Sequence, residues 1–445
     1  MKYELAKLLA GDGFSCSCGK NHFGLLKDCC IGENALAENL IPMLEKYSIR
    51  HPFVLCDRET FRAAGEQVTT LLQQNGIAYT LHCIARTRPA PDERIVGEAV
   101  MFCDARCDGV LAVGGGVIND TGKVLSAARN IPDIYIATAP SMDGFASATS
   151  SMEREGLKVS LPSRCPDAVI GDAAILASAP VEMIRSGVGD MAAKYVSLTE
   201  WEIAHLLIGE YYCPIVADMV RDALETCVRE AEAAVKGDHE AVCHLAEALV
   251  LSGMAMNYAG VSRPASGMEH YISHILDMQA LEFGNPASYH GIQCGVGTLI
   301  TLQAYEKLRS VKPDKEKALA YAKAFSLQAH EEHLRKQLGK GAEAMIAGEA
   351  KEGKYDTAKH EERLEKILSI YDRILACMEK LPAEAELTEF FKKIGHPISG
   401  KEFGVTEDAL KEAFLMAKDI RDKYVLGRLL WDLGLLDEFA AALNV

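Results

Sequence analysis

Hydrophobic and polar residues follow two different patterns along the 445-residue chain. In roughly the first 180 residues, short apolar runs rich in valine and isoleucine alternate with stretches whose apolar residues recur every three or four positions. This alternation predicts parallel strands joined by helices. The predicted strands are PFVLC (52–56), YTLHCI (79–84), GVLAV (109–113), IYIAT (134–138) and DAVIGD (167–172), and DERIVGEAVMFC (92–103) is a helix between them.

Beyond about residue 180 the strand pattern gives way to consecutive helices. The stretch EAVCHLAEALVLSGMAMNYAG is typical, with apolar residues at three- and four-residue spacing. We therefore predict an α/β domain over residues 1–180 and an all-α domain over residues 181–445. Residues 312–365 are dense in charge, which favours solvated helical faces.

The overall composition narrows the class of protein. A hydrophobic fraction of 49% with 25% charged residues indicates a folded globular chain. The net charge of −16 argues against a nucleic-acid partner. Apolar runs all fall short of the ~20 residues of a membrane span, and the sequence opens without a basic-apolar-small leader. We expect a cytoplasmic protein with no membrane partner.

The 14 cysteines are mostly scattered, which favours small buried residues over disulfides. The tightest group is CSCGKNH, which contains Cys16, Cys18 and His22 and is soon followed by Cys29 and Cys30. Zinc sites usually pair C-x₂₋₄-C with a second ligand pair. A C-x-C pair with one histidine therefore favours a hairpin with buried thiols over a metal site.

A glycine-rich segment, GGGVINDTGKV (114–124), follows one predicted strand and opens a helical pattern. It is not a P-loop, because five residues separate Gly116 from Gly122 and Val124 stands where a hydroxyl residue is needed. It also departs from the Rossmann fingerprint, in which the position of Asn119 is glycine. Strand, loop and helix still direct backbone N–H groups at an anion, and glycine permits close approach and positive φ. The loop predicts a phosphate-containing ligand, and a tight turn without a ligand is the alternative.

A second loop, TAPSMDGFASATSS (138–151), follows the next predicted strand, where open α/β sheets bind ligands. It is rich in hydroxyl groups, and Asp143 is its only acid. A turn-forming Asp-Gly pair explains Asp143 equally well. Asp57, directly after the first predicted strand, is placed to accept hydrogen bonds from a ribose, although acids at strand ends are common.

Four residues in the helical half suit a metal site. Asp190 lies in SGVGDMAAKY, His270 and His274 lie one turn apart in SRPASGMEHYISH, and His290 lies at the expected start of the next helix. One carboxylate and two imidazoles leave a coordination position open, as catalytic divalent metals require. The alternative is that each histidine is an ordinary polar residue of an amphipathic helix.

Taken in order, GGGVIND, TAPSMDGFASATSS, GVGDMAAKY, SRPASGMEHYISH and HGIQCGVGT resemble the sn-glycerol-1-phosphate dehydrogenases of bacterial type. That family belongs to the superfamily of iron-type alcohol dehydrogenase, glycerol dehydrogenase and dehydroquinate synthase. The resemblance is close over residues 50 to 300. It implies a dehydroquinate synthase-like fold, with an N-terminal dinucleotide-binding domain and a C-terminal helical domain. It also implies NAD(H) or NADP(H), one divalent metal (Zn²⁺, Ni²⁺ or Fe²⁺) and a homodimer.

The resemblance further implies roles for individual residues. Asp57 would lie near the adenosine ribose, and the metal ligands would be Asp190, His270 and His290. Asp143, Asp190 and His274 would face the substrate, with His274 assisting proton transfer. The remaining cofactor-binding residues would be Gly116, Val117, Ile118, Asn119, Asp120, Thr138, Ala139, Pro140, Ser141 and Ser147.

The implied reaction is the reversible reduction of dihydroxyacetone phosphate, a small phosphorylated three-carbon substrate, to sn-glycerol 1-phosphate. Arg263 and Lys194 are candidates for binding its phosphate. Two alternatives stay open: a dehydrogenase of an unphosphorylated polyol such as glycerol, and a non-catalytic binding protein that retains the fold. A dehydroquinate synthase is less favoured because its larger phosphate-bearing substrate calls for more basic residues.

Overall fold

The computed structural model describes residues 1–9, 11, 13–86, 89–155 and 157–445. The chain forms two compact units. The first, which we call the sheet unit, comprises Met1–Met191 and Pro214–Val261, and the second, which we call the helical unit, comprises Ala192–Cys213 and Ser262–Val445. The proposed division at residue 180 stays a prediction.

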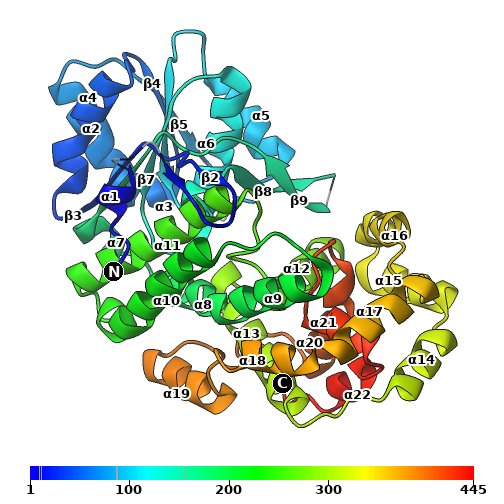
Figure 1. Ribbon diagram of the computed structural model, residues 1–445. Helices are drawn as coiled ribbons and strands as arrows, with labels where there is room; N and C mark the ends of the chain where they lie inside the picture. Colours follow the sequence, from blue (N-terminus) through cyan, green and yellow to red (C-terminus); the bar gives the residue numbers. More distant parts are fainter. Residues whose placement is uncertain (10, 12, 87–88, 156) are drawn as a thin grey trace. The chain divides into compact units, whose positions relative to one another are not determined.

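A six-stranded parallel sheet forms the centre of the sheet unit (Figure 1). Its strands in spatial order are β3 (Asp28–Gly32), β10 (Ala168–Asp172), β7 (Asp133–Ala137), β6 (Gly109–Gly114), β4 (Pro52–Asp57) and β5 (Thr80–Ile84). The four inner strands are almost completely buried, as near-continuous apolar runs in a parallel sheet require. The α/β class predicted for this part of the chain is confirmed.

Helices cover both faces of this sheet (Figure 1). On one face, α2 (Ala35–Lys46) and α4 (Glu66–Gln74) pack their apolar residues against alternate strand residues, such as Val54 and Val113. On the other lie α5 (Glu93–Phe102) and α6 (Gly116–Arg129). A Cβ added to Gly122 of α6 would lie 2.7 Å from the Ala112 Cβ of β6, so glycine is what allows this helix to approach the strand.

Shorter elements and three long helices complete the sheet unit. α10 (Pro214–Ala234) and α11 (His239–Ala259) pack against each other, and α11 also contacts η2 (Asp143–Ala146) and α7 (Ala173–Ala177). The elements are α1 (Leu5–Leu9), β1 (Phe14–Ser15), β2 (Asn21–His22), α3 (Arg58–Thr60), η1 (Phe61–Gly65), η2 (Asp143–Ala146), β8 (Thr149–Arg154), β9 (Leu157–Pro162), α7 (Ala173–Ala177), α8 (Val181–Ala192), α10 (Pro214–Ala234) and α11 (His239–Ala259).

The helical unit contains helices and no strand among its described residues, which confirms the all-α class predicted for this part. Its helices are α9 (Lys194–Ile208), α12 (Met268–Phe283), α13 (His290–Leu308), α14 (Lys315–Ala324), α15 (Leu327–Leu338), α16 (Gly341–Glu352), α17 (Thr357–Ser369), α18 (Tyr371–Met378), α19 (Glu384–Ile394), η3 (Gly400–Phe403), α20 (Glu407–Met416), η4 (Ala417–Asp419), α21 (Leu426–Asp432) and α22 (Leu436–Ala441).

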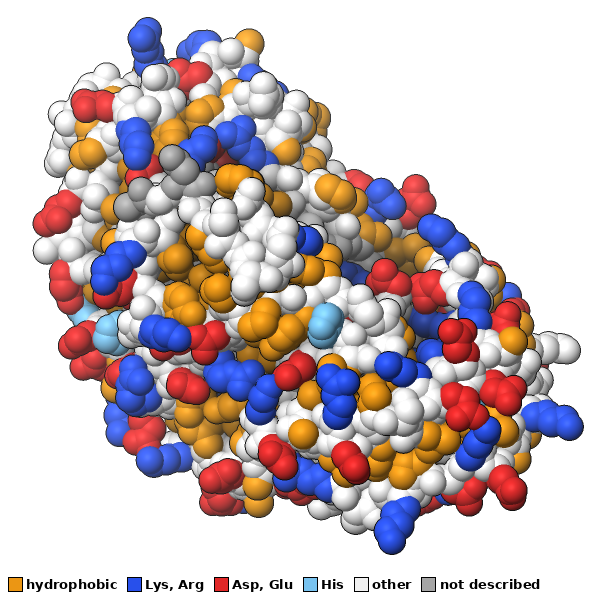
Figure 2. All heavy atoms as spheres, in the orientation of Figure 1, with side chains coloured by type: hydrophobic (Ala, Val, Ile, Leu, Met, Phe, Trp, Pro, Cys, Tyr) orange, Lys and Arg blue, Asp and Glu red, His pale blue; other side chains and the backbone are white. Residues whose placement is uncertain are grey.

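The surface carries charges of both signs. Figure 2 shows acidic and basic side chains interspersed over the face in view. Exposed pairs such as Arg335 with Glu343, 2.7 Å apart, contribute little to stability because water screens them. In the described part of the chain, helices that are both long and apolar enough to cross a membrane are absent.

Candidate functional site

The carboxyl ends of β4 and β6 bring two predicted site segments together. These strands are neighbours in the sheet, with Leu55 opposite Ala112. The chain leaves β4 toward β5 and leaves β6 toward β7 on the other side, so the connections diverge at this pair. Open α/β sheets bind ligands at such a point. Asp57 ends β4 and Gly114 ends β6, so Asp57 and the glycine loop lie at adjacent strand ends.

The glycine loop leads directly into α6, which begins at Gly116. Gly115 provides no side-chain cap, so the first N–H groups of the helix stay available to an anion. The positive φ expected from glycine is not used, because none of residues 114–116 adopts it. Instead, a Cβ on Gly114 would lie 2.6 Å from the Ile118 side chain. Close packing, rather than backbone conformation, explains the glycine at this position.

Asn119 gives this loop an unusual polar group. Its side chain is fully buried, and neither its amide nitrogen nor its amide oxygen has a hydrogen-bond partner among the described residues. Leaving a buried polar group unpaired costs about 1–3 kcal/mol. A side chain retained at this cost fits a ligand that supplies the missing hydrogen bonds.

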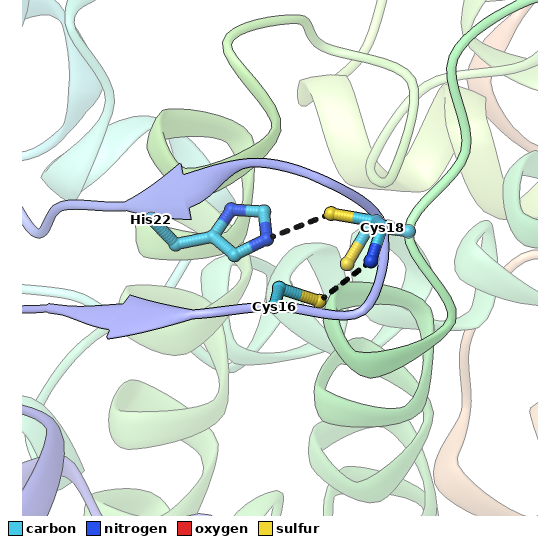
Figure 3. A group of neighbouring side chains, drawn as sticks. Cys16, Cys18 and His22 are labelled. Carbon is cyan, nitrogen blue, oxygen red and sulfur yellow. Dashed lines mark hydrogen bonds between the residues drawn. The ribbon is translucent and has the colours of Figure 1, made fainter.

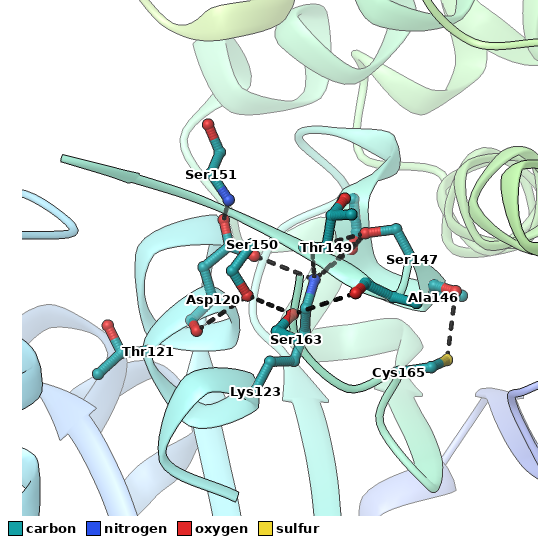
Figure 4. Close-up of polar contacts among 12 residues, drawn as sticks. Asp120, Thr121, Lys123, Ala146, Ser147, Thr149, Ser150, Ser151, Ser163 and Cys165 are labelled. Carbon is teal, nitrogen blue, oxygen red and sulfur yellow. Dashed lines mark hydrogen bonds and ion pairs between the residues drawn. The ribbon is translucent and has the colours of Figure 1, made fainter. Parts of the chain in front are cut away.

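The ammonium group of Lys123 is directed at the second loop. Its ammonium group is buried, donates to the carbonyls of Thr149 at 2.6 Å and Gly144 at 3.1 Å, and pairs with Asp120 at 3.0 Å (Figure 4). Asp120 also accepts a hydrogen bond from the Ser151 N–H at 3.1 Å. Lys123 and Asp120 therefore fasten the second loop to α6. The sequence signal for this role of Lys123 is its three-residue spacing from Asp120, which places both side chains on one face of a helix.

Hydrogen bonds within the second loop and to neighbouring segments hold it in place. The Thr138 N–H donates to the Gly114 carbonyl at 3.1 Å, and the Ser186 hydroxyl donates to the Ser141 carbonyl at 2.9 Å. The Ser147 hydroxyl donates to the Thr149 carbonyl at 2.9 Å. All of the loop residues predicted to bind the cofactor, namely Thr138, Ala139, Pro140, Ser141 and Ser147, are buried.

Asp143 and Asp190 meet within the sheet unit. The Asp143 N–H donates to the Asp190 carboxylate at 2.9 Å, and the Asp143 carboxylate accepts a hydrogen bond from the Ser252 hydroxyl of α11 at 2.8 Å. Asp190 is fully buried inside α8. The Asp143 side chain thus forms a hydrogen bond with α11, which is distant in sequence. A role in its own Asp-Gly turn alone therefore does not explain the aspartate at this position.

Three predicted histidines meet within the helical unit. His270 and His274 lie on α12, and His290 is the first residue of α13, as predicted. The ring centroids of His270 and His290 are 5.1 Å apart, and those of His274 and His290 are 6.0 Å apart. The Glu269 carboxylate lies 2.8 Å from the His270 Nδ1, which leaves Nε2 of that ring as the atom suited to a metal.

Cys294 lies beside these histidines, and the sequence analysis did not predict it as a site residue. One ligand atom from each of His270, His290 and Cys294 lies within 4.8 Å of the others. Burial raises the pKa of the Cys294 thiol, but the two imidazoles lower it more, so that the pKa falls below its ordinary value. A four-residue spacing from His290, one helical turn, was the available signal. Imidazole and thiol are both ligands that divalent transition metals accept.

Arg263 and Lys194, the candidates for the substrate phosphate, have internal partners. Arg263 is buried and bonds both oxygens of Glu210, at 2.7 and 2.6 Å, and the Tyr424 carbonyl at 3.0 Å. Lys194 is buried and donates to the Ala265 carbonyl at 3.0 Å. Both cations therefore fix the backbone around the SRPASG segment.

Comparisons with known proteins agree with this fold. Residues 30–180 match the family model for iron-containing alcohol dehydrogenase. The solved structure of glycerol dehydrogenase from Schizosaccharomyces pombe superposes with a TM-score of 0.60 at 16% identity, covering 94% of this chain and 91% of that one. At this identity the likeness concerns the fold alone.

Two curated relatives extend the match to most of the sequence. A glycerol-1-phosphate dehydrogenase (NAD(P)+) of Bacillus licheniformis is 30% identical over 95% of this chain and 93% of its own length. One of Pyrococcus furiosus is 34% identical over 68% of this chain and 85% of its own length. The chain therefore belongs to the glycerol-1-phosphate dehydrogenase family, as its motifs predicted.

Proposed function

We propose that the protein catalyses the reversible NAD(P)H-dependent reduction of dihydroxyacetone phosphate to sn-glycerol 1-phosphate. The observation that carries this proposal is the relationship to the Bacillus licheniformis enzyme over 93% of that enzyme's length. Near-complete coverage means that both halves of the chain, the sheet with its loops and the helices with their histidines, have counterparts in a named enzyme.

We propose that the dinucleotide binds at the ends of β4, β6 and β7. The uncapped start of α6 would receive the pyrophosphate, and the buried amide of Asn119 would gain the hydrogen-bond partners that it otherwise lacks. Asp57 would accept a ribose hydroxyl. One of its carboxylate oxygens already accepts from the Thr60 N–H at 2.8 Å, which fixes the orientation of the group. The other proposed contacts are Gly116, Val117, Ile118, Asp120, Thr138, Ala139, Pro140, Ser141 and Ser147.

A divalent cation would take Asp190, His270 and His290 as ligands. The donor set fits this role, because His270 has its Nδ1 held by Glu269 and because a carboxylate with two imidazoles suits Zn²⁺, Ni²⁺ or Fe²⁺. When both are bound, the cation supplies Lewis acidity toward the ketone and the nicotinamide supplies hydride.

The protein's own side chains would orient the substrate and move the proton. Asp143 would accept a hydrogen bond from a substrate hydroxyl, with its carboxylate oriented by Ser252. His274, one turn from His270, would carry the proton that the product hydroxyl needs. We also infer from the family resemblance that the protein is a cytoplasmic homodimer. Sedimentation of the purified protein would test the dimer.

The deciding experiment follows NAD(P)H oxidation with two ketones. The purified protein would be stripped of metal by a chelator, reloaded with Zn²⁺, Ni²⁺ or Fe²⁺, and assayed with dihydroxyacetone phosphate and with dihydroxyacetone. We expect turnover of the phosphorylated ketone, lost in the stripped protein and restored by metal. Turnover of dihydroxyacetone alone would instead identify a polyol dehydrogenase. If neither ketone were turned over while NAD(P)H still bound, the protein would be a non-catalytic binding protein.

A further inference from the structure

The segment CSCGKNH, which the proposed reaction does not use, forms a hairpin in the sheet unit. β1 and β2 pair with Phe14 opposite His22, and Cys16 and Cys18 lie on the connecting turn (Figure 3). We expected buried thiols here. Both cysteines are instead partly exposed, and His22 is the buried member, at 1% exposure. A buried imidazole beside two accessible thiols calls for a different explanation.

The three side chains have the spacing of metal ligands. The two sulfur atoms and an imidazole nitrogen lie within 4.8 Å of one another, with the Cys18 Sγ 3.3 Å from the His22 Nε2. In a tetrahedral zinc site, with bonds of about 2.3 Å to sulfur and about 2.0 Å to nitrogen, the sulfur-to-nitrogen edge is about 3.5 Å. In addition, the Cys18 N–H donates to the Cys16 Sγ at 3.5 Å, which fixes the position of that sulfur in the turn.

The orientation of His22 selects one of its nitrogens. Its Nδ1 lies 2.8 Å from the carbonyl oxygen of Tyr258, near the end of α11. Because a carbonyl only accepts hydrogen bonds, Nδ1 carries the proton and Nε2 presents its lone pair to the thiols. The ring also packs against Phe14, with centroids 4.8 Å apart, and against Tyr258 at 6.1 Å. This is how proteins orient metal-binding histidines.

We propose that Cys16, Cys18 and His22 bind a structural Zn²⁺, distinct from the cation of the proposed reaction. Two thiolates and one neutral imidazole supply three of the four positions of a tetrahedral zinc ion. The short C-x-C spacing is compatible with this because the hairpin returns His22 to the same point.

The site would fasten the hairpin to α11, and α11 in turn holds the second loop. Asn257, next to Tyr258, donates to the Ala146 carbonyl at 2.6 Å and accepts from the Ala148 N–H at 3.2 Å. Ser252, on the same helix, bonds Asp143. Zinc at the hairpin would therefore stabilise the helix on which Asp143 depends.

Cobalt substitution tests the proposal in the full-length protein. Thiolate-bound Co²⁺ gives a near-ultraviolet charge-transfer band that carboxylate and imidazole ligands do not give. The band would be recorded in a His290→Ala/Cys294→Ser background, which removes the cluster of His270, His290 and Cys294 as a source of thiolate and metal. We expect one zinc per chain on isolation and a thiolate band after exchange with cobalt. If the protein with its hairpin sequence unaltered showed neither the zinc nor the thiolate band, the proposal would be overturned.

Variants of the hairpin then identify the ligands. In the same background, Cys16→Ser/Cys18→Ser should lose the band and the zinc together. The matched control is Cys243→Ser, which alters a partly exposed thiol of α11 outside the cluster and should retain both. Unchanged zinc content and an unchanged band in the hairpin variant would refute the assignment. The proposed oxidoreductase activity does not enter this test, so the two proposals fail independently.

Discussion

The Asp143 N–H donates a hydrogen bond to the carboxylate of Asp190 at 2.9 Å. This contact joins η2 to α8 and links the two acids that we propose to face the substrate. Both are buried, at 7% and 0% exposure, so neither can move without disturbing the other. Substitutions at the two positions should therefore be non-additive.

Asp190→Asn removes the negative charge of Asp190 but keeps an oxygen that can accept the same hydrogen bond. The amide oxygen can still accept from the Asp143 N–H, but it lacks the charge that a divalent cation needs. We expect loss of bound metal and a fall in kcat/KM of at least about 100-fold, because the metal lowers the activation barrier by several kcal/mol. Metal analysis and steady-state kinetics would measure both. The control is Ser252→Ala, which removes only the hydrogen bond to the Asp143 carboxylate and should retain the metal. Metal retained in Asp190→Asn would contradict the ligand assignment.

His290→Ala should abolish metal retention while leaving NAD(P)H binding nearly intact. The reason is that His290 begins α13 of the helical unit, whereas the proposed cofactor contacts lie at strand ends of the sheet unit. Metal content and the fluorescence of bound NADH would be compared in the same preparations. Cys294→Ser is the matched control. It should keep the metal if Asp190, His270 and His290 are the ligands, and a loss there would make Cys294 a ligand instead.

The sequence predicted the fold well where one pattern dominated. β4, β6, β7 and β10 are buried strands built from nearly continuous apolar runs, and their boundaries, like those of the edge strand β5, differ from the prediction by one residue. β3 (DCCIG) was not predicted because it lies at the sheet edge, is only partly buried and has two cysteines among its five residues. Edge strands need less hydrophobicity, so their sequence signal is weaker.

Contacts between residues that are far apart along the chain could not be predicted from the sequence. The motifs identified His270 and His290, but not the carboxylate of Glu269 that orients His270 or the thiol of Cys294 beside them. Lys123 follows a glycine, as the phosphate-binding lysine of a P-loop does. Its actual bonds go to carbonyls more than twenty residues further along the chain, and spacing along the sequence carries no information about such contacts.

Asn119→Ala should weaken cofactor binding without lowering stability. The buried amide lacks partners among the described residues, so truncation removes an unpaired polar group and leaves the free energy of unfolding unchanged or raised. Loss of its bonds to the cofactor should raise the Kd for NAD(P)H about tenfold, or about 1.4 kcal/mol. Fluorescence titration and urea unfolding would report the two effects. A destabilised variant with unchanged Kd would show that Asn119 serves the fold.

Asp133 should make stability fall as pH rises. Burial raises the pKa of its carboxyl to about 7, with Lys123 opposing and Asp167 reinforcing the shift. Between the ordinary value of 3.8 and about 7, the folded chain holds a proton that the unfolded chain has lost, so each pH step upward in that window destabilises the fold. Above about 7 the full penalty applies.

Asp133→Asn removes this titration. The variant's free energy of unfolding, measured in urea from pH 5 to 8, should rise relative to the wild type by roughly 3 kcal/mol across that range. Asp167→Asn provides a control of opposite sign. Burial alone would raise the pKa of Asp167, but its bonds to Lys27, the Asp133 N–H and Arg164 lower it, so removing its charge should cost most at neutral pH. Parallel stability curves for wild type and Asp133→Asn would show that Asp133 does not titrate in this range, and that water reaches the start of β7.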